Sequence, residues 1–442
     1  MQRIHRFWRR AGASVVLLGS LSACQAQEAA SPIATAKPQQ PAMSRTAAVS
    51  TAPPVTQPAS ATTPFPVWLE ALRAEARRKG VSDGTVSLAL AEVAPIPRVI
   101  ELDQRQPEYT QTFRRYLDGV TSDARIANGK AMMQRHAALL EALEKEYGVP
   151  GRFLVAFWGL ESDFGRDIGS YPVVNALATL AYDGRREAFF RDELFKALTI
   201  LDRGHISFAK MKGSWAGAMG QTQFMPSTFL RYGVDEDRDG HVDIWGSVPD
   251  TLGSAANYLK NIGWDAERTW GREVLLPHNF DAALVSLDVD AKETVKPLSE
   301  WSKLGIKRAD GGALPAAEIT ASLILPDGIK GPAFLVYDNY RVILKFNRSV
   351  FYAVTIGHLA DRLAGAGTLA APRVIFDPLR RDDIATLQMK LAALGFFKGT
   401  PDGVLGPATR QAVRLFQKTT GLPPDGYVDA KLISAVLARP GA

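Results

Sequence analysis

A single glutamate, Glu161, stands near the end of an unusually apolar stretch and is the first candidate for acid chemistry. The stretch runs from Phe153 to Gly165 and is apolar on every side, so as a helix it would be buried rather than amphipathic. Gly148 and Pro150 precede it as a helix-start signal, and Gly165 follows as a stop. The pattern predicts a buried helix that ends beside one carboxyl group.

The neighbours of this glutamate predict an altered ionisation. Trp158 and Phe164 flank Glu161, and a carboxyl group in apolar surroundings loses hydration when it ionises, so we expect its pKa to rise. A carboxylic acid still protonated near neutral pH is what glycosidic cleavage requires, because the leaving oxygen must receive a proton. The alternative is a helix-terminal glutamate that points to water, as most glutamates do.

A second stretch, Ser214–Ser227, combines small residues, glutamines and aromatic rings. Small residues let the backbone approach a ligand closely, and a glutamine side chain offers both a donor and an acceptor. Trp215 and Phe224 supply apolar faces of the kind that pack on sugar rings. By composition alone, the stretch is either a ligand-binding loop or a tightly packed loop between helices.

The acidic run Asp235–Asp243 has the spacing of a calcium loop, with Gly240 at its sixth position. Gly246 stands where an EF-hand has its closing glutamate, so the closing ligand is missing at the standard spacing, and Asp250 could supply it from further on. The candidate ligands are Asp235, Asp237, Asp239, the backbone carbonyl of His241, and Asp250. We expect one structural Ca²⁺, weakly held or replaceable by Na⁺, and no cofactor or metal for catalysis. The alternative is an acidic turn that binds nothing.

Length, composition and charge allow a soluble protein of two or three domains. The chain has 442 residues, with 46% hydrophobic and 22% charged residues, both ordinary values. Its formal charge of +6 falls to +2 without the four arginines of the first 23 residues. The charge is therefore weak support for a polyanionic partner, and we expect no nucleic-acid binding.

The single cysteine, Cys24, follows a signal-like start. Arginines, a short apolar run at residues 13–18 and the ending Leu21–Cys24 form a secretory signal at 1–23, too short to span a membrane. The ending resembles a bacterial lipoprotein signal, in which the cysteine becomes the lipidated first residue; the alternative is ordinary signal cleavage. Since Gln25 rather than Asp follows, the sorting pattern of such lipoproteins implies the outer membrane.

The rest of the chain divides by composition into a tether at 24–64, a globular body at 65–365, a linker at 366–380 and a small module at 381–440. Strand-like alternation appears only late in the body. We predict an α+β fold, predominantly α, with a small sheet after residue 270. The helices that the periodicity predicts include 126–147, 188–203, 227–232 and 251–262, and the best strands are Ala321–Leu325 and Ala333–Tyr337.

The C-terminal module contains an imperfect internal repeat. Pro401–Gly403 is matched by Pro424–Gly426, and Leu387–Gln388 is matched by Phe416–Gln417. Each Asp-Gly pair predicts a turn, because glycine accepts positive φ. We expect helices at 383–394 and 408–419, between these turns. The module resembles the peptidoglycan-binding domains that are often joined to wall hydrolases.

Glu161–Gly165 followed by Gly217–Ser227 resembles the lysozyme-like lytic transglycosylases of bacterial cell walls, and residues 65–365 resemble the membrane-bound lytic murein transglycosylase B family. The resemblance implies cleavage of the β-1,4 bond between N-acetylmuramic acid and N-acetylglucosamine, leaving a 1,6-anhydromuramyl end. Phe346 stands where the family leads us to expect a tyrosine. The residues at the family's glycan-contacting positions are Ser214, Gln223, Tyr258, Asn347, Tyr352 and Tyr116.

The residues favour a mechanism with one acid. Asp163, the nearest second acid, is two residues from Glu161, which on a helix is roughly the opposite face. Glu161 would protonate the leaving oxygen and then take a proton from the muramyl 6-hydroxyl. The rival hypotheses are a lysozyme-type hydrolase and a non-catalytic lipoprotein that binds the wall. We expect a monomeric periplasmic enzyme that binds glycan strands and is anchored to the outer membrane through lipidated Cys24.

Overall fold

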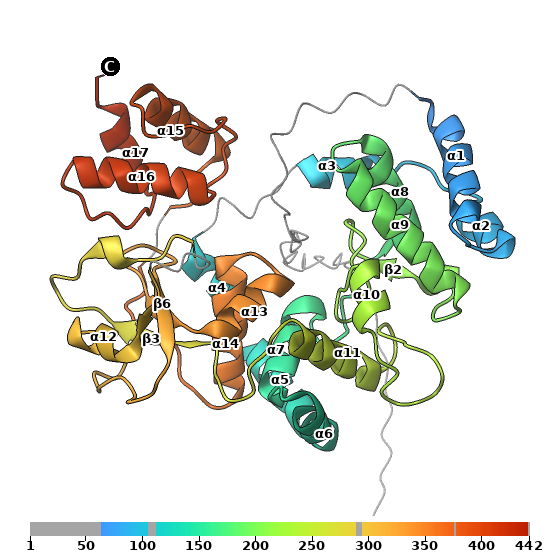
Figure 1. Cartoon of the computed structure of the whole chain (residues 1–442), viewed down its shortest axis with the longest axis horizontal. Coiled ribbons are helices and arrows are strands. Elements are labelled where there is room, and N and C mark those ends of the chain that lie inside the picture. Colours follow the sequence, from blue (N-terminus) through green and yellow to red (C-terminus); the bar gives the residue numbers. More distant parts are fainter. Residues whose placement is uncertain (1–62, 105–111, 289–293, 375–376, 441–442) are drawn as a thin grey trace, which may run out of the picture. The chain divides into compact units, whose positions relative to one another are not determined.

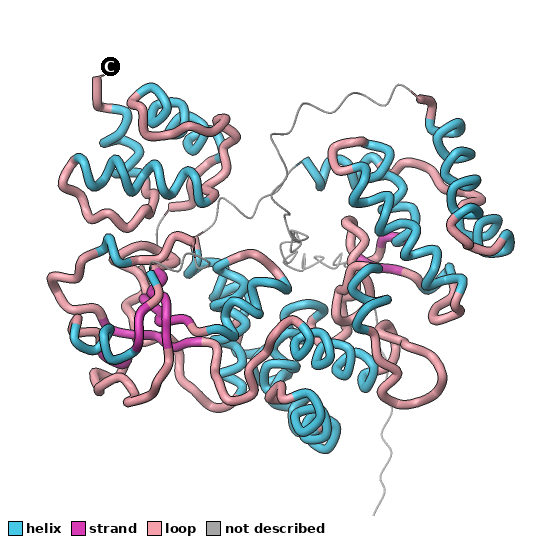
Figure 2. The backbone as a smooth tube through the Cα atoms, in the orientation of Figure 1, coloured by secondary structure: helices cyan, strands magenta, loops and turns pink. Residues whose placement is uncertain are grey.

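The computed structural model describes residues 63–104, 112–288, 294–374 and 377–440. The predicted signal, Cys24 and nearly all of the tether lie outside the described residues. Helices dominate the described chain, and its strands form two small sheets (Figures 1 and 2). In this part of the chain, no helix combines the length and apolarity needed to cross a bilayer.

A first group of helices packs around the pair α8 and α9, which run side by side (Figure 1). Leu177 of α8 and Leu194 and Leu198 of α9 are fully buried in their shared core. The helices of this group are α1 (Phe65–Arg78), α2 (Asp83–Ala89), α3 (Pro97–Gln104), α8 (Val173–Asp183), α9 (Glu187–Asp202) and α10 (Pro226–Tyr232). Ser82 accepts the backbone N–H of Thr85 and so caps α2.

A second group of helices surrounds α7, which packs against α5, α6, α11 and α14. Every residue of α7 except Arg152 is buried, as its apolar composition predicts. The helices of this group are α4 (Phe113–Val120), α5 (Asp123–Arg135), α6 (Ala137–Tyr147), α7 (Gly151–Ser162), α11 (Val248–Asn261), α13 (Asp338–Phe346) and α14 (Val350–Leu363). A helix buried on all sides holds its terminal residues firmly in place.

The single helix predicted over 126–147 is wrong, because the chain bends at His136 and forms α5 and α6. His136 has φ −109° and ψ 23°, outside the helical range, and its ring lies against Trp158 at 5.8 Å between centroids. The bend lets α5 pack against α7 and α14 while α6 packs against α7 and α11. Tertiary packing on two different partners overrides the continuous helical pattern.

The larger sheet follows residue 270, as predicted, and its neighbouring strands are all antiparallel. The strand order is β4 (Lys296–Pro297), β6 (Thr320–Ile324), β7 (Ala333–Val336), β3 (Gly271–Leu275) and β5 (Lys307–Arg308), and α12 (Leu298–Lys303) follows β4. A second ladder, β1 (Tyr171–Pro172) with β2 (Lys212–Gly213), precedes residue 270, where no strand was predicted. Two-residue strands are too short to show an alternation in the sequence.

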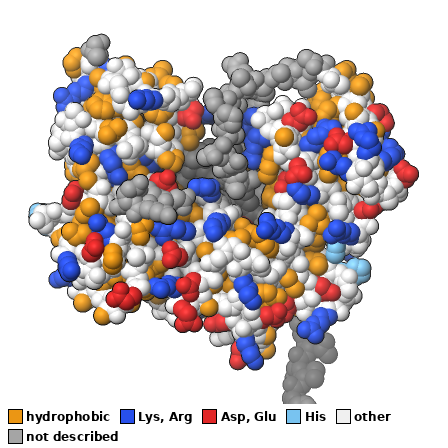
Figure 3. Space-filling view, viewed as in Figure 1, with side chains coloured by type: hydrophobic (Ala, Val, Ile, Leu, Met, Phe, Trp, Pro, Cys, Tyr) orange, Lys and Arg blue, Asp and Glu red, His pale blue; other side chains and the backbone are white. Residues whose placement is uncertain are grey.

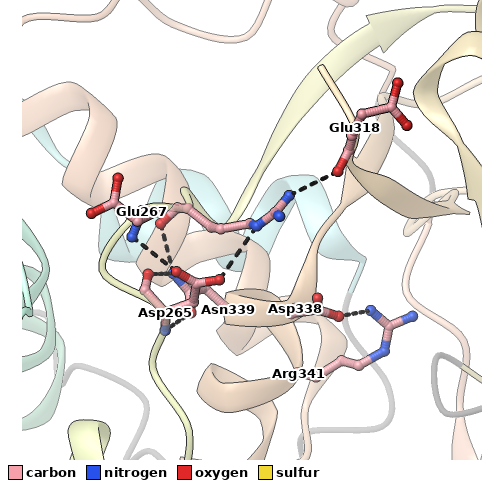
Figure 4. A network of polar contacts seen from close by, with 7 residues as sticks. Asp265, Glu267, Glu318, Asp338, Asn339 and Arg341 are labelled. Carbon is pink, nitrogen blue, oxygen red and sulfur yellow. Dashed lines mark hydrogen bonds and ion pairs between the residues drawn. The ribbon is translucent and has the colours of Figure 1, made fainter.

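One buried amide ties α13 to the segment before β3 (Figure 4). The Asn339 Oδ1 accepts the N–H of Asp265 at 2.8 Å, and its Nδ2 donates to the carbonyls of Asp265 and Arg268 at 2.8 and 2.7 Å. At the same end of α13, Arg341 pairs with Asp338 at 3.2 Å. The helix that leads to Phe346 and Asn347 is therefore fixed at its start.

The C-terminal module contains three helices, α15 (Arg381–Ala393), α16 (Pro407–Thr419) and α17 (Ala430–Leu437). Leu387, Val413 and Val436, one from each helix, are fully buried in a core of their own. The sequence predicts α15 and α16, whereas α17 was not predicted. Asp429 caps α17 by accepting the N–H of Leu432, so a start signal for this helix was present in the sequence.

Candidate active site

Glu161 lies in the last turn of α7 with 7% of its surface exposed. The Tyr352 hydroxyl, in the first turn of α14, donates a hydrogen bond to Glu161 Oε1. Tyr352 is itself held by its helix start, where the Ser349 Oγ accepts the Tyr352 N–H at 3.3 Å. The orientation of the buried carboxyl group is thus set by a helix far along the chain.

The backbone directly after α7 is held in an unusual conformation. Asp163 and Phe164 have φ values of 50° and 60°, and Gly165 follows at 79°. Side chains other than glycine rarely adopt such angles, and they gather at functional sites. The turn directs Asp163 to Arg125 and Arg166, at 3.6 and 3.0 Å, rather than into the cavity beside Glu161.

Gln221 links α7 to two neighbouring segments. Its Oε1 accepts the indole N–H of Trp158 at 2.8 Å, and its Nε2 donates to the carbonyl of Trp245 at 3.1 Å. Its backbone N–H donates to the carbonyl of Ile244 at 2.7 Å. Gly165 lies so close that a Cβ there would be 2.3 Å from Gln221 Oε1. The small residue at 165 is therefore required by this approach.

The loop Ser214–Ser227 is a tight turn rather than an open coil. Met219 and Phe224 exchange backbone hydrogen bonds of 2.8 and 3.1 Å across it. Gln223, at φ 53°, donates from its side-chain amide to the carbonyls of Ile168 and Gly220, each at 2.8 Å. The side chain of Gln223 is thereby held in place before any ligand binds.

A cavity of about 180 Å³ opens beside Glu161. The residues predicted for substrate binding that line it are Gln223, Tyr258 and Asn347, which come from the loop, from α11 and from the end of α13. Burial raises the pKa of Tyr258 to about 12, so its hydroxyl stays protonated, and it donates to the carbonyl of Lys345 at 3.3 Å. The wall therefore offers both polar groups and aromatic faces to a ligand.

Phe346 supplies an apolar ring next to the acid. It stacks on Tyr352 with 6.2 Å between centroids and 15° between planes, and it contacts Phe157 at 4.8 Å and Phe224 at 6.1 Å. The ring takes the place of the tyrosine expected from the family. Any contact of this residue with a sugar is therefore through its face, without a hydroxyl group.

Two further acids line the same cavity, and both form hydrogen bonds or ion pairs with other groups of the protein. Asp103 pairs with Arg185, whose Nε donates to Asp103 Oδ2 at 2.7 Å. Glu193 accepts the backbone N–H of Ser227 at 2.9 Å and the Ser227 hydroxyl at 2.6 Å. Burial raises the pKa of Glu193. Both acids therefore have a structural role. Asp103 fixes α3 to the turn between α8 and α9, and Glu193 fixes α10 to α9.

Three of the residues predicted to bind substrate lie away from the cavity wall. Ser214 accepts the N–H of Ala218 at 3.0 Å through its Oγ and is half-buried. The Tyr116 ring packs against Phe351 at 6.1 Å. Tyr352 is fully buried, and its hydroxyl is directed to Glu161.

The sequence did not single out the α9 side of the cavity. Arg186, Phe189, Phe190 and Glu193 all line it, and the Arg186 guanidinium lies over the two phenylalanine rings at 4.5 and 5.0 Å. In the sequence these residues are one part of an ordinary amphipathic helix. The buried Glu193 forms a hydrogen bond with Ser227, 34 residues away, so no local sequence pattern indicates its position in the cavity.

The acidic loop brings part of the predicted metal set together. Single carboxylate oxygens of Asp235, Asp237 and Asp250 lie within 4.8 Å of one another. Asp250 also accepts backbone N–H groups from Glu236, Asp237 and Asp243, with the shortest bond at 2.7 Å. The Asp239 carboxylate accepts the N–H of His241 and is not part of the group of three.

The surface carries no extended field of one charge on the face shown in Figure 3, where basic and acidic side chains are interspersed. This distribution agrees with the modest net charge left once the N-terminal arginines are set aside.

With the acid, its tyrosine and the aromatic cavity in view, comparison with known proteins decides the family. The family model of the transglycosylase SLT domain matches residues 64–361. The chain belongs to this family. Residues 380–436 match the model of a putative peptidoglycan binding domain. The predicted recognition and the α-rich, lysozyme-like fold are confirmed.

Relatives with known names support this family assignment. Over 256 residues the chain is 30% identical to membrane-bound lytic murein transglycosylase B of Escherichia coli (strain K12), covering 57% of this chain and 67% of that protein. SltB3 from Pseudomonas aeruginosa, solved in complex with NAG-anhNAM-pentapeptide, is 43% identical with a TM-score of 0.81, covering 85% of this chain and 99% of that one. Escherichia coli Slt35, solved in complex with calcium, is 26% identical with a TM-score of 0.59, covering 67% and 92%.

These findings assign a general activity to the chain. It is a lytic transglycosylase that acts on peptidoglycan, with a C-terminal peptidoglycan-binding module. Its relatives of the murein transglycosylase B type are cell-envelope enzymes, which is consistent with the periplasm. The prediction of an enzyme is thereby confirmed.

Proposed function

We propose that the chain cleaves the β-1,4 bond between N-acetylmuramic acid and N-acetylglucosamine, and that Glu161 acts first as acid and then as base. The observation that carries this proposal is the burial of Glu161 in the wall of an aromatic cavity. Ionising a carboxyl group there costs hydration free energy, which favours the protonated form that the first step uses.

The proposed reaction needs no water. The Glu161 proton passes to the bridging oxygen as the bond between that oxygen and the muramyl anomeric carbon breaks. The muramyl 6-hydroxyl oxygen then bonds to the anomeric carbon, and its proton returns to the Glu161 carboxylate. The acid is regenerated, and the product is a 1,6-anhydromuramyl end. A nucleophile held within the substrate has a high effective molarity, which reduces the need for a second catalytic carboxylate.

The neighbours of Glu161 support this role. The Tyr352 hydroxyl holds one oxygen of the carboxyl group, while Asp103 and Glu193 are engaged by Arg185 and Ser227. Gln223, Tyr258 and Asn347 are the proposed sugar contacts within the cavity. We retain Ser214 and Tyr116 as proposed contacts of a longer strand.

Digestion of purified sacculi by the wild-type chain and the Glu161→Gln variant tests the mechanism. The proposal expects products with anhydro ends from the wild type, each lighter by one water than a hydrolytic product, and no release by the variant. Reducing ends would favour the hydrolase, and near-normal turnover by the variant would mean that the acid is wrongly assigned. No release even by the wild-type chain would favour a purely wall-binding protein.

We also propose that the C-terminal module holds the enzyme on the wall and that lipidated Cys24 anchors it to the outer membrane. The match of residues 380–436 to a peptidoglycan-binding family supports the first part, and the signal-like segment before Cys24 supports the second. Fractionation of cells that express the Cys24→Ala variant tests the anchor: the variant should leave the outer membrane and stay in the periplasm.

A structural Ca²⁺ in the acidic loop is a further part of the proposal. The carboxylates of Asp235, Asp237 and Asp250 suit a hard cation that prefers oxygen ligands. Because Asp250 also accepts three backbone N–H groups, the site would be weak. The thermal midpoint should fall when a chelator is added and recover with Ca²⁺; an unchanged midpoint would leave the loop as an ordinary acidic turn.

A further inference from the structure

The C-terminal module contains two copies of one hydrogen-bonded turn. In copy one, Gln388 donates to Asp402 Oδ1 at 2.8 Å and accepts the N–H of Gly403 at 2.8 Å. In copy two, Gln417 donates to Asp425 Oδ1 at 2.8 Å, and its Oε1 accepts the backbone N–H of the following glycine at 2.8 Å. Each aspartate thus has one oxygen bound inside the module and a second, Oδ2, directed elsewhere.

An arginine stands at the equivalent place in both copies. Arg381 and Arg410 each precede the glutamine of their copy by seven residues. A Cβ on Gly403 would lie 2.8 Å from the Arg381 carbonyl oxygen, and one on Gly426 would lie 2.9 Å from the Arg410 carbonyl oxygen. The close approach of turn and arginine backbone is therefore the same in both copies.

Copy two is occupied by a peptide loop of the catalytic domain. Asp425 Oδ2 accepts the backbone N–H of Ile329 at 3.0 Å. The Tyr427 ring covers Gly328, where a Cβ would lie 2.6 Å from the ring. The carboxylate of Asp327, in the same loop, acts electrostatically on Arg410. The Asp327 carboxylate itself accepts the backbone N–H groups of Phe113 and Arg114 at 2.9 and 3.0 Å. The loop is thus seated on the turn through an amide on the aspartate, and its acidic side chain acts on the arginine through charge alone.

Copy one has the same glutamine, aspartate, glycine and arginine and is exposed, while Val404 stands where copy two has Tyr427. Asp402 is exposed whereas Asp425 is buried, and within the described residues Asp402 Oδ2 has no hydrogen bond or ion pair. Arg381 is also exposed; its Nε donates to the Asp402 carbonyl at 3.1 Å, and its terminal nitrogens meet no described acid. A carboxylate oxygen and a guanidinium side by side suit a ligand with an amide N–H and a carboxylate.

We propose that the Arg381–Asp402 face of copy one is the wall-binding face of the module and that it takes an acidic peptide, the peptide stem of peptidoglycan rather than the glycan. The occupied copy gives the geometry of the contact between a peptide amide and the aspartate within the same chain, and the exposed guanidinium of Arg381 adds a site for a carboxylate. The inference rests on the proposed wall-targeting function of the module and gives it a site and a ligand class.

Binding of the full chain to purified sacculi tests the inference, with Glu161→Gln introduced throughout so that the wall is not consumed. The test variants are Arg381→Ala and Asp402→Asn, the second of which keeps the size of the turn residue. The matched controls are Arg380→Ala and Asp382→Asn, neighbouring exposed residues with the same charge changes. Sacculi stripped of their stems by an amidase provide the second substrate, and a thermal midpoint checks the fold of each variant.

Each test variant should weaken binding to intact sacculi by about tenfold, the loss of one charge-assisted contact, while the controls bind as the parent does. Stripped sacculi should bind the parent and Arg381→Ala equally weakly. Equal binding of parent and test variants to intact sacculi, or undiminished binding of the parent to stripped sacculi, would overturn the inference. Neither result would affect the anhydro products of the wild-type chain, so the two proposals fail separately.

Discussion

Two buried glutamates line one cavity and are held in different ways. Glu161 ends α7 and meets the hydroxyl of Tyr352, whereas Glu193 lies within α9 and accepts both the N–H and the hydroxyl of Ser227 at the start of α10. The first carboxyl group meets a side chain that adjusts to either protonation state, and the second meets a helix start that prefers the anion. Burial alone therefore does not distinguish the two carboxyl groups; their hydrogen-bond partners do.

The largest expected effect separates the two glutamates directly. Glu161→Gln should lower the rate of anhydro-product release by about a thousandfold, within the range of a lost general acid, because the amide cannot give up a proton. Glu193→Gln should lose far less, since the amide still accepts from Ser227. Release rates from sacculi by both variants measure the contrast, and similar losses in the two would show that the comparison is mistaken.

A second test concerns the partner of Glu161. Tyr352→Phe removes the hydroxyl that holds the carboxyl group and should slow turnover by about tenfold to a hundredfold, with little change in binding to sacculi. Tyr340→Phe is a matched control, because the Tyr340 hydroxyl is buried and has no hydrogen-bond partner among the described residues. If both variants keep full activity, Tyr352 does not position the acid.

The hydrogen bonds between Glu193 and Ser227 are tested by the free energy of unfolding rather than by the rate of product release. Glu193→Ala leaves the N–H and hydroxyl of Ser227 without their acceptor and should lower the free energy of unfolding by about 2 kcal/mol. Glu193→Gln should recover most of that loss. Denaturant unfolding at neutral pH compares the two, and equal losses would point to packing instead of hydrogen bonding.

The smallest effect is a pH dependence. Burial raises the pKa of Glu193 above its ordinary value of 4.5 and outweighs the Ser227 hydrogen bonds, which favour the anion. The folded chain therefore holds this proton more tightly than the unfolded chain. Its contribution to stability is complete below pH 4.5 and is lost as the pH rises through the folded pKa. The wild type should therefore lose stability relative to Glu193→Gln over this range in unfolding experiments. A difference that stays constant with pH would contradict the raised pKa.

The features that depend on a short stretch of sequence were predicted correctly. The buried helix around Glu161, the sheet after residue 270 and two helices of the C-terminal module follow from short stretches of sequence. The partners of the site do not, since Tyr352 is 191 residues from Glu161 and Ser227 is 34 residues from Glu193. The bend at His136 was missed for the same reason, because distant packing decides it.

The resemblance to the transglycosylase family supplied some site residues that local sequence patterns do not indicate. It drew attention to Tyr258, Asn347 and Tyr352, which no periodicity singles out. It did not distinguish side chains that line the cavity, such as Tyr258, from Tyr352, which lies behind the wall and contacts the acid. That distinction depends on depth of burial, which a one-dimensional pattern does not carry.

The amide of Gln221 has a wider consequence. It joins Trp158, less than one turn before Glu161, to the carbonyl of Trp245, which follows the acidic run. A change in the shape of that run by an ion, a substitution or heat would therefore reach the end of α7, where Glu161 stands, through one side chain. With Glu161 as the proposed acid, we expect a perturbation of the run to lower product release at temperatures where spectroscopy still finds the chain folded.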